Sequence, residues 1–248
     1  MTGVAIAAAG MAFSASRPAR AQLPPDTTGP VVRLSATAYA SDESRDRHFR
    51  LRWQGTDAGS GIAAYRLEVQ SKANVSTRWR TVGAAPNART ATFRGRPGRA
   101  YLFRLRARDL AGNLSRYAYA GTVVPLDDSS PRVLRSSGWR TVGDARAYGR
   151  RVSRTQTPGS TLHLLFRGDR VALIASRSPR GGRLRVSLGK RSSVVSLKGP
   201  RRHRQVVFSS RVLRVGVHVL RLRSLSGGIV NVDAVGLDTG PPPPSGLR

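Results

Sequence analysis

Strict alternation of apolar and polar side chains limits the folds open to this chain more than any other feature of its sequence. In residues 48–53, His-Phe-Arg-Leu-Arg-Trp, three apolar side chains alternate with basic ones, and the same period of two recurs in residues 63–70 and 101–107. Successive side chains of a β-strand point to opposite faces of a sheet, so this pattern predicts half-buried antiparallel strands rather than helices. We therefore expect an all-β protein.

The strands fall into two series with a polar segment between them. Residues 125–130, with prolines at positions 125 and 131, predict a short linker between domains at 26–124 and 131–238. In the second domain, turn residues separate seven expected strands, at residues 161–166, 170–176, 183–188, 193–197, 205–213, 217–223 and 229–237. Residues 239–248, with four consecutive prolines, cannot join a sheet and are predicted to be an extended, disordered tail. The sequence thus predicts two antiparallel β-sandwiches in tandem.

The amino terminus has the features of an export signal. An apolar run at residues 4–15 is followed by Ala19-Arg20-Ala21, the small-x-small pattern that signal peptidase cleaves. The run is shorter than the ~20 residues that cross a bilayer, so we expect no membrane span. We predict a signal peptide at residues 1–21 and a secreted protein, extracellular or associated with the cell wall.

The charge points to anionic partners. The formal net charge is +30, and residues 127–248 hold 24 basic and 6 acidic residues, so the excess is concentrated in the second half. Such a charge attracts anionic polymers at low salt. Lysine accounts for only three of the 43 basic residues, and this arginine bias also fits a GC-rich coding sequence. A solvated arginine surface and a functional basic face therefore both remain open.

Catalytic and metal chemistry find little support. The chain has no cysteine, and its four histidines are scattered. Glu43 and Glu68 are the only glutamates, and Asp57 and Asp109 occur in turn-forming sequences. Neither the paired carboxylates of a glycosidase nor a nucleophile beside an activating base is visible. We expect a protein that is not an enzyme and that has no cofactor and no metal site.

Residues 26–124 resemble fibronectin type III domains of the bacterial secreted kind. The resemblance rests on Trp53 at the end of an alternating strand, on Asp57-Ala58-Gly59-Ser60-Gly61-Ile62, and on Tyr101-x-Phe103-x-Leu105-x-Ala107 followed by Asp109-x-Ala111-Gly112-Asn113. It implies that Trp53 fills the core and that the Tyr101 hydroxyl ties a loop to a strand. Domains of this family are mostly spacers or protein-binding modules, so the resemblance implies no activity.

Residues 131–237 look like the galactose-binding-like jelly rolls that include many carbohydrate-binding modules. The matching segments are Ser137-Gly138-Trp139, Gly168-x-x-Val171-Ala172-Leu173-Ile174, Gly216-x-His218-x-Leu220 and Val230-Asn231-Val232-Asp233-Ala234. The resemblance implies that Asn231 or Asp233 contacts a sugar, although either could instead bond backbone at a strand end. Trp139 and Tyr148 are the candidate aromatic platforms, with packing in the core as the alternative.

Together these features predict a secreted, non-catalytic binding protein in which a fibronectin type III spacer presents a carbohydrate-binding-like module to a cell-wall or extracellular glycan. The ligand would be a glycan or an anionic cell-envelope polymer, and the expected loop contacts to its acidic groups are Arg177, Arg180, Arg183, Arg201, Arg202 and Arg204. The alternative is an adhesion or scaffold protein that makes protein–protein contacts. Nucleic acid is disfavoured because the sequence shows neither a recognition helix nor interleaved aromatic residues.

The export prediction is tested at the amino terminus. Protein recovered from the culture medium should begin at Gln22 or within two residues of it, because cleavage follows Ala21. Intact-mass analysis measures this directly. Material that retains Met1 and remains in the cytosol would contradict the prediction.

Overall fold

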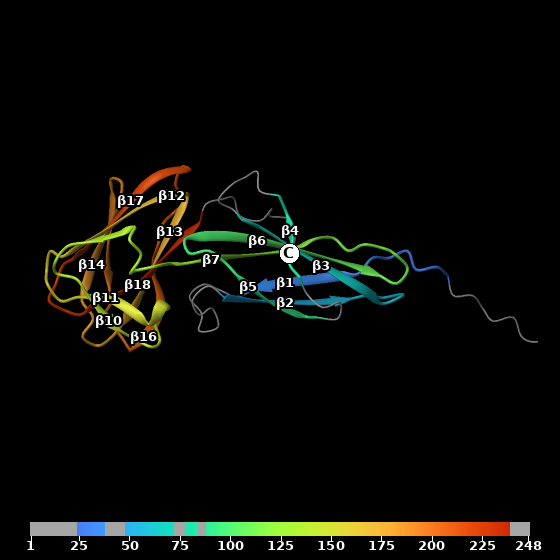
Figure 1. Cartoon of the computed structure of the whole chain (residues 1–248), viewed down its shortest axis with the longest axis horizontal. Helices are drawn as coiled ribbons and strands as arrows, with labels where there is room; N and C mark the ends of the chain where they lie inside the picture. Colours follow the sequence, from blue (N-terminus) through green and yellow to red (C-terminus); the bar gives the residue numbers. More distant parts are fainter. Residues whose placement is uncertain (1–23, 38–47, 72–77, 84–87, 239–248) are drawn as a thin grey trace, which may run out of the picture.

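The computed structural model describes residues 24–37, 48–71, 78–83 and 88–238 as two β-sandwiches that lie end to end (Figure 1). The all-β expectation is confirmed, since the one helical turn in the described residues is the short 3₁₀ segment η1 (Tyr148–Arg150). None of the described helical residues forms a segment long and apolar enough to cross a membrane. The predicted signal peptide and the predicted proline-rich tail lie outside the described residues.

The first sandwich packs a three-stranded sheet, ordered β1-β2-β5, against a four-stranded sheet, ordered β4-β3-β6-β7. Its strands are β1 (Val31–Ala36), β2 (His48–Thr56), β3 (Ile62–Ser71), β4 (Arg80–Thr81), β5 (Thr90–Arg94), β6 (Arg99–Asp109) and β7 (Ala118–Val124). All of the strand pairs are antiparallel.

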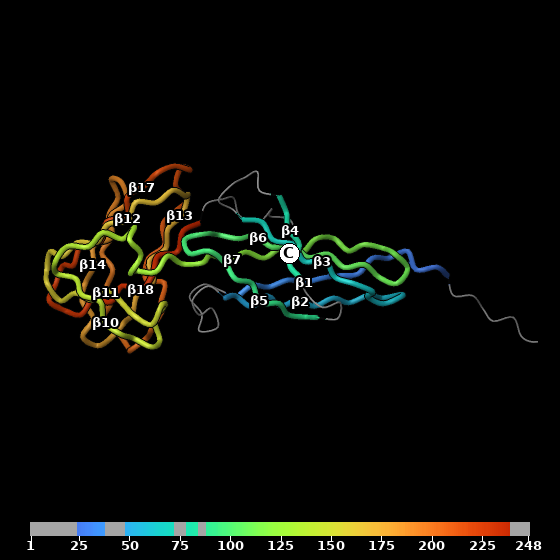
Figure 2. The backbone as a smooth tube through the Cα atoms, viewed as in Figure 1, coloured from blue at the N-terminus to red at the C-terminus, as the bar shows by residue number. Residues whose placement is uncertain are grey.

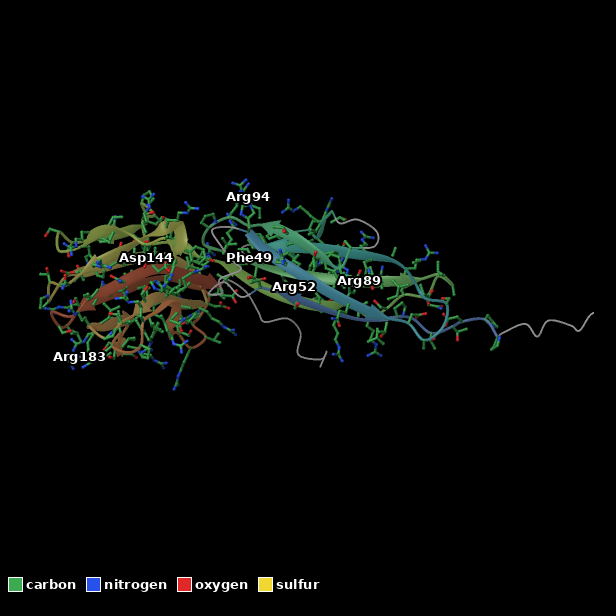
Figure 3. The ribbon with its side chains drawn as sticks, turned by 90° about the horizontal axis from the view of Figure 1, so that it is seen from below. Phe49, Arg52, Arg89, Arg94, Asp144 and Arg183 are labelled. Carbon is green, nitrogen blue, oxygen red and sulfur yellow. The ribbon has the colours of Figure 1, made fainter. Side chains whose placement is uncertain are left out.

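Alternation along β2 explains how this sandwich packs. Phe49, Leu51 and Trp53 are at most 3% exposed and lie in one apolar cluster, whereas Arg50 and Arg52 are exposed. Figure 3 labels one residue of each kind on this strand, Phe49 and Arg52. The core position predicted for Trp53 is therefore confirmed. Burial of these large side chains is the main source of stability here, because the chain has no cysteine with which to form a disulfide.

Tyr101 fastens the loop between β5 and β6. Its ring is buried, and its hydroxyl oxygen accepts a hydrogen bond of 2.9 Å from the backbone N–H of Arg96. The structural role expected for Tyr101 is thus confirmed. The hydroxyl satisfies a loop N–H that lies at the edge of the core, where an unpaired amide would be costly.

The second sandwich consists of a five-stranded sheet, ordered β15-β14-β17-β12-β9, and a six-stranded sheet. The latter is ordered β10-β11-β18-β13-β16, with β8 also paired to β18. The strands are β8 (Leu126–Asp127), β9 (Val133–Arg135), β10 (Arg140–Gly143), β11 (Arg151–Thr155), β12 (Thr161–Gly168), β13 (Arg170–Arg177), β14 (Arg183–Leu188), β15 (Arg191–Ser196), β16 (Arg202–Ser209), β17 (Gly216–Ser224) and β18 (Val230–Asp238). The seven expected strands are all present, with bounds shifted by up to four residues.

The segment at 125–130, predicted to be a linker, is part of the second sandwich. The chain passes from β7 directly into β8 (Figure 2), whose residues pair with Ala234 and Val235 of β18. Leu126 joins the apolar core, and the Asp128 side chain is buried. The segment is polar and bounded by prolines, which favours a linker, but pairing with a central strand satisfies its backbone groups.

Loss of the Trp53 indole should destabilise the first sandwich. Trp53→Ala removes buried aromatic area and leaves a cavity, so we expect the free energy of unfolding to fall by about 3–5 kcal/mol. Amide hydrogen exchange of β3 and β6 in the full chain measures the change. Leu165→Ala, at a position that is 58% exposed, is the control and should change stability by about 0.5 kcal/mol or less. A loss below about 1 kcal/mol for Trp53→Ala would contradict the assigned packing.

Candidate functional site

The six-stranded sheet is irregular near one end of β13. Ile174 lies opposite Ala234, but Ala175 lies opposite Val232, so Asp233 is an extra residue in β18. The pairing of β13 with β16 also shifts twice, and Arg204 of β16 adopts a left-handed backbone with φ of 53°. Bulges of this kind bend a strand and redirect its side chains.

A cleft of about 540 Å³ opens at this irregular end of the sheet. It is lined from β11, from the end of β13 and the loop after it, from the start of β16 and from β18. The polar residues that line it are Asp144, Arg154, Ser176, Arg177, Ser178, Arg180, Arg201, His203 and Asn231. Four guanidinium groups thus surround a cleft that contains a single carboxylate. None of the described residues that line it is Phe, Tyr or Trp.

Three interactions fix the side chains of the cleft. Arg154 Nε donates a hydrogen bond of 2.8 Å to Asn231 Oδ1, and Arg177 Nη1 donates one of 3.1 Å to the carbonyl of Ser196. His203 Nδ1 lies 3.1 Å from Asp144 Oδ2. With its oxygen engaged, the Asn231 amide presents its NH₂ group as a donor. The arrangement offers an oxygen-rich ligand several hydrogen-bond donors and a positive potential.

Two further polar atoms at the cleft have no hydrogen-bond partner among the described residues. They are the buried Ser176 Oγ and the buried Nε2 of His203. Buried polar atoms usually have a partner, because leaving one unpaired costs free energy.

The structure brings together four of the predicted residues: Arg177, Arg180, Arg201 and Asn231. Arg202 is exposed but does not line the cleft. Arg183 lies on β14, in the opposite sheet, and Figure 3 shows it at the margin of the second sandwich, away from Asp144. The two predicted arginine loops therefore contribute to the cleft only in part.

Tyr148, Arg204 and Asp233 are internal residues, contrary to the prediction that they contact a ligand. Asp233 is fully buried, and its Oδ1 accepts a hydrogen bond of 2.8 Å from the backbone N–H of Tyr148. The Tyr148 ring is 3% exposed and packs with Ile174 and Ala234, while the Arg204 guanidinium lies 4.5 Å from the ring centroid. The 3₁₀ turn thus folds over the bulged strands and covers these side chains. The alternative of a backbone contact is confirmed for Asp233.

Trp139 is also a core residue and not a stacking platform. It is 8% exposed and belongs to the apolar cluster between the two sheets. Half-buried aromatic side chains occur on the first sandwich instead, where the guanidinium of Arg104 lies 4.3 Å from the Trp79 ring and 4.5 Å from the Tyr117 ring. The ring faces are therefore already in contact with arginine, so these residues form a cation–π stack rather than a free platform for a sugar.

Five polar residues of the cleft were not predicted: Asp144, Arg154, Ser176, Ser178 and His203. His203 lies inside the basic run at 201–204. The run predicted ligand contacts for its three arginines, and the same run could have indicated the histidine. Arg154 lies directly opposite Asn231 in the pairing of β11 with β18. These two positions are 77 residues apart, and no local pattern indicates that they meet.

Two buried carboxyl groups lie beneath the bulge. Burial raises the pKa of Asp233 to about 8, although the hydrogen bond from Tyr148 and the charge of Arg204 oppose the rise. Burial likewise raises the pKa of Asp128 to about 7, against the hydrogen bond that the Ser153 hydroxyl donates to it. Both groups therefore hold a proton in the folded protein at a pH where an exposed aspartate is ionised.

Among the described residues, the group suited to hold a metal ion is in the first sandwich. Oxygens of Asp26, Asp57 and Asp109 lie within 4.8 Å of one another. Each carboxylate already accepts backbone N–H groups: Asp26 from Thr28 and Ser60, Asp57 from Gly59 and Gly61, and Asp109 from Asn113. The hydrogen bond from the Ser60 N–H is the largest of several that hold the pKa of Asp26 well below its usual range. The turn roles predicted for Asp57 and Asp109 are confirmed, while Asp57 Oδ1 is buried without a hydrogen-bond partner among the described residues.

The structure is similar in part to several solved proteins. A family two carbohydrate esterase from Cellvibrio japonicus is 15% identical, with a TM-score of 0.35, over 49% of this chain and 36% of that one. CBM35 from the same organism is 13% identical, with a TM-score of 0.33, over 44% of this chain and 94% of that one. Carbohydrate-binding modules of promiscuous specificity from the beta-sandwich super family are 14% identical, with a TM-score of 0.36, over 85% of this chain and 98% of that one.

This chain spans only 36% of the length of that esterase. No protein-family model and no curated protein matches the sequence. At these identities and scores, the similarities do not assign a family or a ligand.

The raised pKa of Asp233 predicts a pH-dependent stability. Aspartate in an unfolded chain has a pKa of about 3.9, so between about pH 4 and about pH 8 only the folded state keeps this proton. The free energy of unfolding should therefore fall as pH rises through that window. The Asp233→Asn variant lacks this titrating group. As pH rises through the same window, its free energy of unfolding should therefore increase steadily relative to that of the wild type, and above the window the difference should be constant. Urea denaturation at several pH values measures the difference, and equal differences at about pH 5 and about pH 8 would contradict the prediction.

Proposed function

We propose that this protein is a secreted, non-catalytic glycan-binding protein whose cleft on the second sandwich binds an acidic sugar. The observation that carries the proposal is the convergence of Arg154, Arg177, Arg180, Arg201 and Asn231 on one cleft. Guanidinium groups bind carboxylates through paired, charge-assisted hydrogen bonds, and an amide with free donors suits sugar hydroxyl groups.

An acidic ligand fits the cleft better than a neutral one. Neutral sugars are usually held by stacking on the faces of Phe, Tyr or Trp, and the described lining contains none of these residues. The lining instead contains four arginines and a histidine but only one carboxylate. That carboxylate belongs to Asp144, which interacts with His203. An anionic group would lower the mutual repulsion of the guanidinium groups as it binds.

The chemistry of the cleft also favours binding over catalysis. Glycoside hydrolysis by the common mechanisms needs two carboxyl groups flanking the bond, and the cleft offers one. The buried carboxyl groups of this sandwich, Asp128, Asp169 and Asp233, are at most 6% exposed, and none of them lines the cleft.

For the first sandwich we propose a fibronectin type III spacer. Its three-plus-four strand arrangement, the buried Trp53 and the hydrogen bond from Arg96 to Tyr101 support this assignment. Export to the cell wall or the extracellular space would give the second sandwich access to its glycan.

Neighbouring arginines provide a matched test. Arg201→Ala removes a guanidinium from the cleft, whereas Arg202→Ala makes the same change of charge at an exposed position outside it. On a glycan array at about 0.15 M salt the full chain should retain acidic glycans, and Arg201→Ala and Asn231→Ala should each weaken binding about tenfold or more. Arg202→Ala should have little effect.

The same comparison separates a cleft from a merely sticky surface. If the arginines act only as a diffuse field, Arg201→Ala and Arg202→Ala will weaken binding equally and Asn231→Ala will do nothing. The absence of any retained glycan would overturn the proposal and favour a role in adhesion through protein contacts.

A further inference from the structure

The outer face of the five-stranded sheet carries a second group of basic residues, separate from the cleft. Arg183 and Arg185 of β14 and Arg221 and Arg223 of β17 are all exposed. They alternate with Leu184, Val186, Leu220 and Leu222, which point into the core. Strand alternation therefore places all four guanidinium groups on one side of the sheet.

This arrangement concentrates like charge without compensation. Arg185 lies directly opposite Arg223 in the pairing of β14 with β17, and like charges at such positions repel. The five strands of this sheet contain no aspartate or glutamate. None of the four arginine side chains has an ion pair or a hydrogen bond with any other described residue. The face is thus available to an anionic partner that would relieve the repulsion.

The basic face adjoins the cleft at one edge of the sheet. Arg177, which lines the cleft, donates its hydrogen bond to the carbonyl of Ser196, and Ser196 is the strand partner of Arg183. One guanidinium of the cleft therefore lies at the sheet edge where the basic face begins. A linear ligand that fills the cleft can extend over this edge.

We propose that the outer face of the five-stranded sheet binds the continuation of an acidic polysaccharide whose end occupies the cleft. The inference rests on the proposed function and extends it from one sugar to a chain that carries carboxylates at regular intervals. Guanidinium forks match carboxylate groups, and Thr161, opposite Arg223, offers a hydroxyl to the sugar. Phe, Tyr and Trp do not occur at outward positions of β12, β14 or β17, so the stacking that single-stranded nucleic acids use is missing.

Chain length provides the test, with the full-length protein and two probes, trigalacturonate and long-chain polygalacturonate. The wild type should bind the long chain about tenfold more tightly than the trimer, because only the long chain reaches the face. Arg185→Glu with Arg223→Glu should abolish that difference and leave the affinity for the trimer unchanged. The control, Arg33→Glu with Arg50→Glu, makes the same charge change on outward positions of β1 and β2 and should keep the preference.

The outcomes separate this inference from the proposed function. If the trimer and the long chain bind the wild type equally, or if the Arg185/Arg223 variant keeps the preference, the inference is overturned and the cleft proposal stands. If the trimer does not bind but the long chain binds through Arg185 and Arg223, the cleft proposal fails and the inference fails with it, because the basic face then binds the chain without an end held in the cleft. Equal affinity for single-stranded DNA, lost in the same variant, would overturn the polysaccharide as the occupant, and binding of neither saccharide would overturn both proposals.

Discussion

The hydrogen bond from the Tyr148 backbone to the buried Asp233 carboxyl group is the interaction on which the candidate site depends. It fastens the turn at 148–150 over the bulge of the six-stranded sheet, and the carbonyl of Arg150 in this turn accepts a hydrogen bond of 3.0 Å from the backbone N–H of Asp144. Asp144 then interacts with His203 at the cleft. A protonated Asp233 avoids the cost of a buried charge, and so the arrangement of the cleft rests on a fully buried carboxyl group that does not line it.

The arginines of this chain fall into three groups: those that stabilise the fold, those that line the cleft and those that are exposed on a sheet face. Arg104 stacks between two aromatic rings and bonds the nearly buried Glu68, and Arg204 lies over a buried tyrosine, so both stabilise the fold. Arg154, Arg177, Arg180 and Arg201 converge on the cleft. Others, such as Arg185 and Arg223, repel each other across a sheet. Net charge alone cannot separate these groups, because it records neither the burial of a guanidinium nor what lies beside it.

Sequence reasoning located strands more reliably than side-chain roles. The alternation around Trp53 and Tyr101 predicted both the strands and the buried positions, because burial of one face follows directly from the pleat. The same reasoning misplaced Asp233 and Arg204, since each lies at an irregularity of β18 or β16 that changes the direction of the side chain. It could not find Arg154, whose partner Asn231 comes from a strand 77 residues away.

The sequence by itself determined the all-β class, the division into two sandwiches and the excess of positive charge, since these depend on local periodicity and composition. It also indicated Asn231 and three of the arginines of the cleft. Only the tertiary structure decided that Trp139 and Tyr148 are buried, that 125–130 belongs to a sheet, and that Arg183 lies on a different face from Arg177 and Arg180. The physical reason is that strand pairing and bulges between distant segments, and not the sequence near a residue, fix the face on which each side chain lies.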